Sequence, residues 1–378
     1  MMSLGLYIHI PFCRRKCFYC DFPSYTGLEH LYSAYVAALC REIADQGGIL
    51  SGAVVDTVFI GGGTPTVLSG KLLAAVMDSI RQAFKLADNT EISIEANPGT
   101  ADRSMLDQLR QCGVNRMSFG VQSFSDPVLA ALGRIHTAGE AVQAVELAQK
   151  AGFENLNLDL MYGLPDQSLH DLHDSLAMAY RLNVRHLSVY GLKVEEGTGF
   201  AYLANQGRLN LPDDELDDAM YEAVMDSMPK LGFARYEISN FARPGYQCRH
   251  NLKYWQYQPY LGLGAAAHSF IDGQRRANVS DVQTYIDSVS SGQPPVVLIE
   301  QPDRQTAMAE FCFLALRTVQ GLSVSQFQHC FSCDFFSVYQ FAVDRLVRKG
   351  AVIVAGDNVR LTALGMKFGN QVFSEFLL

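Results

Sequence analysis

The chain has 378 residues and a net charge of −9, with 48% hydrophobic and 18% charged residues. This composition supports a sizeable core and excludes an intrinsically disordered protein. The acidic balance argues against a protein that binds nucleic acid by bulk electrostatics. No secretory signal pattern or apolar run of membrane-spanning length is present, so we expect a cytoplasmic protein without a transmembrane segment. In that compartment its nine cysteines stay reduced and serve as metal ligands or buried side chains.

Apolar runs alternate with amphipathic segments over the first two thirds of the chain. The predicted strands are 6–10, 57–60, 91–95, 116–121, 155–161, 186–190 and 236–239. The predicted helices are 32–46, 71–84, 103–112, 139–151, 169–182 and 215–231. Strands that alternate with helices and are buried on both faces are typical of a parallel sheet. We therefore predict an α/β fold, with a partial or complete (β/α) barrel over residues 1–240.

Each of five successive predicted strands ends in residues that a plain core strand does not need. These residues are Gly61 to Gly63, Glu95 with Asn97, Gln122, Asp159 with Tyr162 and Gly163, and Tyr190 with Lys193. In a barrel, such positions meet at the C-terminal rim, where the loops build active sites. The pattern predicts one shared site.

Three cysteines lie within eight residues directly after the first predicted strand, in PFCRRKCFYCDF. A structural zinc site normally takes four protein ligands, and a disulfide takes two. Three thiolates, from Cys13, Cys17 and Cys20, can hold three irons of a [4Fe–4S] cluster and leave the fourth iron open. The alternatives are incidental thiols, or a zinc site completed by His9 or a distant residue.

The last third of the chain departs from the strand–helix alternation. Residues 241–302 begin with an aromatic-rich stretch, CRHNLKYWQYQPYLGLGAAAHSF, which we interpret as a connecting segment that packs on the barrel. It ends in a predicted linker, SSGQPPVVLIEQPD. Residues 303–378 contain predicted helices at 304–317, 324–330 and 336–349, and then a hairpin, which predicts a smaller, mostly helical, winged-helix-like domain. With seven Lys or Arg against six Asp or Glu, this domain offers no basic DNA-binding face.

The motifs LYIHIPFCRRKCFYC, GGGTPT, IEANP, SFGVQSF, LGRIH and LDLMYGLP occur in this order. Together they resemble the radical S-adenosylmethionine enzymes and, among these, the oxygen-independent coproporphyrinogen III oxidase group. The resemblance implies that the three cysteines bind the cluster and that its open iron chelates S-adenosylmethionine. In that family an electron, supplied by a donor such as flavodoxin or ferredoxin, cleaves the sulfonium to a 5′-deoxyadenosyl radical.

Carried over by position, the resemblance also implies the S-adenosylmethionine pocket. Tyr7 would lie against the cofactor. Its methionine part would be faced by Gly62, Gly63 and Thr64. Its ribose and carboxylate would be surrounded by Glu95, Gln122, Arg134 and Asp159. Carboxylates accept from amine and hydroxyl groups, and a guanidinium pairs with a carboxylate.

A further motif, HNLKYW at residues 250–255, matches the H-N-x-x-Y-W motif of the HemW haem chaperones, a branch of the same group. In that family the motif is associated with haem binding, so the resemblance implies His250 as the axial ligand of haem iron. A neutral histidine is a good axial ligand, and Tyr254 and Trp255 supply flat apolar surface. The alternatives are an aromatic segment that only packs the linker onto the barrel, and Cys248 as a competing axial ligand.

Two departures separate the chain from the oxidases. Phe22 stands where they have a further cysteine, and only six residues precede Tyr7, where they have a long segment that helps to form the substrate site. We therefore expect a haem chaperone that binds the cluster, S-adenosylmethionine and haem, and passes haem to recipient haem proteins. A recipient in a membrane would bring the chaperone into transient contact with that membrane. The alternatives are a coproporphyrinogen III decarboxylase, and a radical enzyme that acts on another tetrapyrrole, such as one that opens haem.

Overall fold

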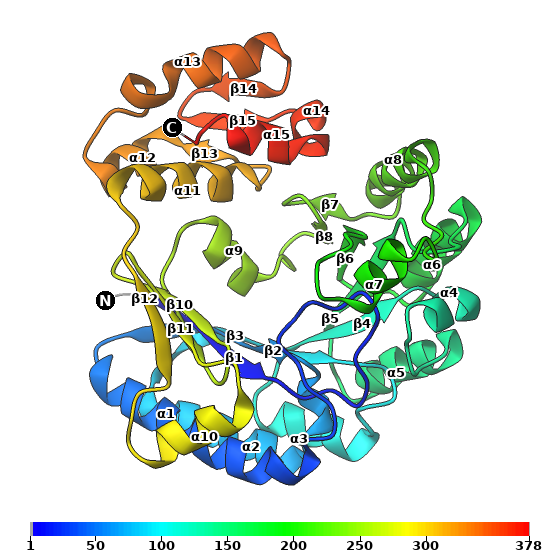
Figure 1. Cartoon of the computed structure of the whole chain (residues 1–378), viewed down its shortest axis with the longest axis vertical. Helices are drawn as coiled ribbons and strands as arrows, with labels where there is room; N and C mark the ends of the chain where they lie inside the picture. The colour runs from blue at the N-terminus through cyan, green and yellow to red at the C-terminus, as the bar shows by residue number, and fades with distance from the viewer. Residues whose placement is uncertain (1–2, 378) are drawn as a thin grey trace.

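One twelve-stranded sheet organises the structure (Figure 1). The computed structural model describes residues 3–377. Six neighbouring strands form its parallel centre, namely β1 (Ser3–Ile10), β2 (Val54–Gly62), β3 (Lys85–Ala96), β4 (Arg116–Gln122), β5 (Asn155–Tyr162) and β6 (His186–Gly191). The intervening helices are α1 (Tyr32–Ile49), α2 (Gly70–Ala83), α3 (Arg103–Gln111), α4 (Asp126–Ala131), α5 (Ala138–Lys150) and α6 (Leu169–Arg181). After β6 come α7 (Gly199–Asn205) and α8 (Asp214–Lys230). The predicted α/β fold is confirmed, and α4 and α7 are additions to it.

Shorter strands extend the sheet at both edges. Beyond β6 lie β8 (Asn240–Ala242) and β7 (Ala234–Arg235), which run antiparallel to their neighbours. Beyond β1 lies the parallel β9 (Tyr260–Leu263), followed by antiparallel β10 (His268–Ile271), β11 (Gln274–Asn278) and β12 (Val296–Glu300). Since β12 and β7 are the two outer strands of one open order, the barrel is partial.

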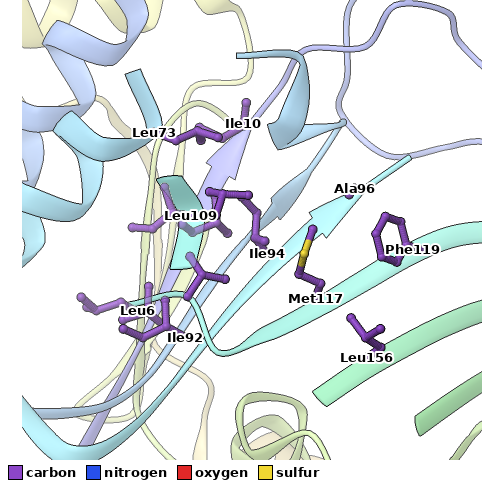
Figure 2. Packing of buried hydrophobic residues seen from close by; sticks show 14 of the residues in the cluster. Leu6, Ile10, Leu73, Ile92, Ile94, Ala96, Leu109, Met117, Phe119 and Leu156 are labelled. Atoms are coloured by element: carbon purple, nitrogen blue, oxygen red, sulfur yellow. The ribbon is translucent and has the colours of Figure 1, made fainter. Parts of the chain in front are cut away.

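The outer face of the sheet forms the main core. Successive strand residues point to opposite faces, and alternate apolar residues such as Leu6, Ile92 and Ile94 turn towards the helices. There they pack with Leu73 of α2 and Leu109 of α3, as Figure 2 shows. Burial of this apolar face drives the helices onto the sheet.

The inner face of the sheet is polar along much of its length, not only at the strand ends. Its buried polar residues include Glu91, Ser93, Arg116, Ser118, Asn157, His186 and Ser188. The strands are therefore buried on both faces, as predicted, but only the helix-facing side is apolar.

The C-terminal domain has its own core. Its helices are α11 (Arg304–Leu316), α12 (Val324–Phe331), α13 (Phe335–Arg348), α14 (Ala363–Lys367) and α15 (Gly369–Ser374). Its strands are β13 (Leu322–Ser323), β14 (Val352–Ala355) and β15 (Asn358–Leu361), in the order β13-β15-β14. The three predicted helices and the hairpin are confirmed.

Two local predictions are wrong. Residues 236–239, predicted as a strand, form the turn between β7 and β8, because the Glu237 carboxylate accepts hydrogen bonds from Ser239 N and Asn240 Nδ2 and closes the chain on itself. The predicted linker contains β12, which pairs with β11. Residues 241–302 also supply α9 (Arg249–Trp255) and α10 (Val282–Ser290), and α10 packs on α1, where Tyr285 Oη donates to Glu42 at 2.6 Å.

None of the helices within residues 3–377 combines the length and the apolar character that crossing a bilayer demands.

Candidate cluster and cofactor site

A cavity of about 350 Å³ lies at the C-terminal ends of the parallel strands. We call it the cysteine cavity. Its lining includes Cys13, Cys17, Cys20, Phe22, Gly62, Gly63, Thr64, Glu95, Asn97, Ser118, Gln122, Arg134, Asp159, Tyr190 and Lys193. The side chains that the sequence predicted at one rim are thus largely brought together, because parallel strands present their carboxyl ends at the same edge. Tyr7, Gly61, Tyr162 and Gly163 are not among the lining residues.

The cysteine loop is held in place by backbone hydrogen bonds. Cys13 N donates to Tyr25 O at 2.9 Å, and Gly63 N and Thr64 N donate to Ile10 O and Phe12 O at 2.8 and 2.7 Å. The GGGTPT loop therefore fastens the cysteine loop to the end of β2, and all three thiols are partly buried against the cavity.

The three thiols suit a cluster better than a single metal ion. Within residues 3–377, no three Cys, His, Asp or Glu side chains come close enough to surround one ion. His9, the candidate fourth zinc ligand, has its nitrogens at 3.0 Å from Tyr7 Oη and 2.8 Å from Pro23 O. In a four-iron cluster each thiolate binds a different iron, so three separated thiols around one cavity fit that group.

The glycines at the end of β2 leave space for neighbouring groups of the protein, namely His9, Phe12 and Glu95. A Cβ at Gly62, where φ is +109°, would lie 2.5 Å from the His9 ring, and a Cβ at Gly63 would lie 2.5 Å from Phe12 O. A Cβ at Gly61 would lie 2.8 Å from the Glu95 carboxylate. These glycines are therefore required by the close packing of the cysteine loop and Glu95 against the end of β2.

Two partly buried carboxyls, Glu95 and Asp159, face the cavity. Burial, then the charge of Asp159, raises the pKa of Glu95 to about 8, although Gly62 N donates to its Oε2 at 3.0 Å. Burial also raises the pKa of Asp159, against hydrogen bonds from Asn157 and Ser118. A bound cation such as an amine would favour the ionised carboxylates, so this pair offers acceptors for a positively charged amino acid.

Arg134 is already engaged by the protein. Its Nη1 lies 3.4 Å from Cys17 Sγ, and its Nη2 donates to Asn97 Oδ1 at 2.6 Å and to the Gly120 carbonyl. It therefore ties the cysteine loop to the ends of β3 and β4. The predicted pairing of Arg134 with a cofactor carboxylate would require some of these contacts to be exchanged.

Gln122 lies in the left-handed region, with φ of 69°, at the end of β4. A non-glycine residue there costs about 1 kcal/mol or more, and such strain gathers at functional sites. This backbone feature agrees with a site role for Gln122 that the motif alone implied.

Sequence reasoning missed a hydrogen-bonded chain inside the barrel. His186 Nδ1 lies 2.5 Å from Asn157 Oδ1, and Asn157 Nδ2 donates to Ser118 Oγ at 2.6 Å. Ser118 Oγ then donates to Asp159 Oδ2 at 3.0 Å. The missed signal was alternation: polar residues occupy every second position of β6, of β5 up to Asp159, and of β4 except at Gly120.

A second cavity, of about 540 Å³, lies between the barrel, α9 and α11. We call it the aromatic cavity. It is lined by Tyr7, His9, Phe22, Pro23, Tyr254, Trp255, Tyr257, Gln258, Tyr260, Ala266, His268, Phe270, Arg275, Glu310, Phe313 and Leu314. Phe22 lines both cavities, so the two adjoin at this residue.

Tyr7 lines the aromatic cavity. Its ring stacks on Phe59 and its Oη lies 3.0 Å from His9 Nδ1. Burial, followed by the charge of Glu95, raises the pKa of Tyr7. Tyr7 thus lines the aromatic cavity and is close enough to Glu95 of the cysteine cavity to feel its charge. Contact of Tyr7 with S-adenosylmethionine stays a prediction.

His250 lines neither cavity. Its ring is fully buried, with Nδ1 2.9 Å from Thr57 Oγ1 and Nε2 2.8 Å from Tyr254 Oη. Burial, then the charge of Lys253, lowers its pKa to about 3, so the ring is neutral. Both nitrogens have protein partners, so the predicted iron ligation by His250 would require the ring to leave one of them.

Cys248, the competing ligand, also lines neither cavity. It is fully buried, with Sγ 3.7 Å from Glu91 Oε1, and burial raises its pKa to about 12. The Glu91 carboxylate also accepts from Arg249 N and His250 N, at 3.1 and 3.2 Å. Glu91 therefore fixes the start of α9 against β3.

Sequence comparison places these features in a known group. The Radical SAM superfamily profile matches residues 7–179, and the HemN C-terminal domain profile matches residues 303–368. The chain is 40% identical over 372 residues to the heme chaperone HemW of Bacillus subtilis (strain 168), with 98% of both chains covered. The chain belongs to the HemW heme chaperone family. It is also 43% identical over 275 residues to the family member of Escherichia coli (strain K12), with 72% of each chain covered.

The fold agrees with this family. Coproporphyrinogen III oxidase (HemN) from Escherichia coli superposes with a TM-score of 0.87, over 100% of this chain and 90% of that one, at 24% identity. At this identity the likeness shows the fold alone. Membership of the superfamily implies a [4Fe–4S] cluster and S-adenosylmethionine, whereas haem is connected with the chain through the name of its relatives.

Proposed function

We propose that the protein is a haem chaperone that binds a [4Fe–4S] cluster, S-adenosylmethionine and haem, and delivers haem to recipient haem proteins. The observation that carries this proposal is the pair of adjoining cavities, one lined by three thiols and two partly buried carboxyls, the other by aromatic rings. The relatives named heme chaperone, which match nearly the whole chain, support it.

The cysteine cavity is the proposed place of the cluster and S-adenosylmethionine. Cys13, Cys17 and Cys20 would bind three irons, and Arg134 would hold Cys17 in place through its contact with the sulfur. When bound, the cluster supplies one-electron chemistry and an open iron for the amino acid part of the cofactor. The donor of that electron would be a flavodoxin or a ferredoxin.

The remaining pocket residues are assigned by their places around the cavity. Gly62, Gly63 and Thr64 would face the methionine part of S-adenosylmethionine. The ribose and the carboxylate would be surrounded by Glu95, Gln122, Arg134 and Asp159. Tyr7 would approach from the aromatic side. The support is that all of these except Tyr7 line one cavity with the three thiols.

Haem binding is proposed to depend on His250 and the rest of HNLKYW. The motif forms α9, which contributes Tyr254 and Trp255 to the wall of the aromatic cavity. Haem would be released to a recipient haem protein in the cytoplasm, or to one in a membrane that the chaperone contacts transiently.

The second candidate function is oxidative decarboxylation of coproporphyrinogen III. The matches to the Radical SAM superfamily profile and to the HemN C-terminal domain profile favour it. Phe22 disfavours it, because this residue stands where the oxidases have a further cysteine.

One paired experiment separates the two functions. The protein is reconstituted anaerobically and given reductant, S-adenosylmethionine and coproporphyrinogen III, while a second sample is titrated with haem. A chaperone gives no protoporphyrinogen and a stoichiometric haem spectrum, and His250→Ala binds haem more weakly. Steady formation of protoporphyrinogen, or the absence of haem binding, would refute the chaperone proposal.

A further inference from the structure

The size and the aromatic lining of the aromatic cavity suit a large flat ring as ligand. Its walls carry eight aromatic side chains, namely Tyr7, Phe22, Tyr254, Trp255, Tyr257, Tyr260, Phe270 and Phe313. Aromatic faces pack well on one another, and ligand cavities are typically about 300–1,000 Å³ with a few polar groups among apolar ones. A cavity of about 540 Å³ falls within that range.

The imidazoles that line this cavity are not equivalent. His9 is buried, and both of its nitrogens have partners, Tyr7 Oη and Pro23 O. His268 has an exposed side chain, and within residues 3–377 its ring makes no hydrogen bond. A neutral imidazole with a free nitrogen is a good haem ligand, so His268 is available where His9 is not.

The backbone that carries His268 is held within the sheet. The residue opens β10, which pairs with β11 through His268 and Ala277. A Cβ at Gly262 of β9 would lie 2.0 Å from His268 O, so the two strands approach more closely than any other residue would allow. A ligand on a fixed strand is positioned more precisely than one on a loop.

Arg275, a charged residue of the cavity wall, is already paired with carboxylates. Arg275 pairs with Glu310, and its Nη1 lies 3.3 Å from Glu300 Oε2. Two carboxylates thus already neutralise this guanidinium. The cavity therefore offers no free guanidinium from Arg275 for a propionate, and the aromatic walls and an iron ligand must supply the selectivity.

We propose that haem binds in the aromatic cavity with His268 as an axial ligand, and that His250 is a positioning residue. The inference rests on the proposed haem-chaperone function and names its haem site. His250 reaches the cavity wall through its hydrogen bond to Tyr254, at 2.8 Å. Ligation gives the imidazole lone pair to ferric iron in place of a water molecule, so no proton or electron is transferred.

The test is a haem titration followed by absorbance and magnetic circular dichroism. His268→Ala should weaken haem binding at least tenfold, which corresponds to about 1.4 kcal/mol, and should remove the signature of an imidazole ligand. Added imidazole should restore that signature. The matched control is His170→Ala, an exposed histidine on α6 whose side chain is 83% accessible, and it should bind like the unmodified protein.

Two further variants keep the inference falsifiable. Leu314→Trp fills the cavity from α11 and should also weaken haem binding, with the cluster iron content unchanged. His250→Ala should bind haem more weakly but keep the imidazole signature, because the ligand is still present. Circular dichroism and thermal unfolding establish that each variant is folded.

The outcomes separate this inference from the function on which it rests. If the unmodified protein binds no haem, the chaperone proposal fails. If it binds haem and His268→Ala keeps both affinity and spectrum, only the assignment of His268 fails. Loss of the imidazole signature in His250→Ala instead would assign the ligand to His250 and overturn the inference, and undiminished binding by Leu314→Trp would place haem elsewhere.

Discussion

The Tyr254 phenol and the His250 imidazole lie 2.8 Å apart, one turn from each other on α9. Tyr254 lines the aromatic cavity and His250 lies behind it, where Thr57 Oγ1 lies 2.9 Å from the other ring nitrogen. A neutral histidine has one donor and one acceptor nitrogen, so these two partners satisfy the ring completely. The histidine of the HNLKYW motif is thus built into the junction of α9 and β2.

His250→Ala is therefore expected to destabilise the fold by about 2–4 kcal/mol, because it leaves a buried cavity and two groups without their partner. Denaturant unfolding of the apoprotein measures this change. His170→Ala, at an exposed position, should change the free energy of unfolding by less than about 0.5 kcal/mol. A His250→Ala protein as stable as the original would show that the ring is not held as described.

Cys17→Ser is expected to abolish the iron–sulfur cluster. The change removes one of three thiolates and the sulfur that Arg134 contacts at 3.4 Å. Iron content and visible absorbance after anaerobic reconstitution measure the loss. Cys330→Ser is the matched control, since Cys330 is exposed in the C-terminal domain. An unchanged iron count in Cys17→Ser would refute the cluster assignment.

Glu95 is expected to make the apoprotein less stable as the pH rises. Burial, with the charge of Asp159, raises its pKa from the ordinary 4.5 to about 8. Between these values the unfolded chain has lost a proton that the folded carboxyl keeps, so the free energy of unfolding falls by about 1.4 kcal/mol per pH unit. Because His250, with its pKa lowered to about 3, contributes the opposite slope below pH 6.5, the Glu95 contribution is the difference in slope between the unmodified protein and Glu95→Gln across this window.

The control for this pH dependence is Glu154→Gln, because Glu154 is exposed. It should keep the slope of the unmodified protein. An equal slope in Glu95→Gln would mean that another group is responsible.

Asp56→Ala is expected to cost about 3 kcal/mol, because it leaves a buried ammonium without its counter-ion. Lys253 of α9 has a side chain that is 3% exposed, with Nζ 2.8 Å from Asp56 Oδ1 on β2. Unfolding of Asp56→Ala measures the loss, and the double variant with Lys253→Met should recover most of it. Lys150→Met breaks a pair with both side chains at least half exposed and should cost less than about 1 kcal/mol.

If Lys253→Met alone proved as costly as Asp56→Ala and the double variant recovered nothing, the two side chains would contribute independently. The ion pair would then not be what anchors α9 to the barrel.

Local patterns in the chain predicted much of the fold. The six central strands and their helices follow from alternating apolar and amphipathic segments. The edge strands were missed, because β7 and β8 have two and three residues and carry too little periodicity. The predicted linker contains a strand because β12 pairs with β11, a contact that the local sequence does not show.

The sequence by itself determined the three-cysteine loop, the rim residues and the family, since each depends on the order and spacing of neighbouring residues. Only the tertiary structure decided that His250 lies behind Tyr254, that Phe22 lines two cavities and that His268 faces one of them. His250 meets Thr57 across 193 residues of sequence. A side chain's hydrogen-bond partners and the space in front of it are set by distant segments, and no local pattern records them.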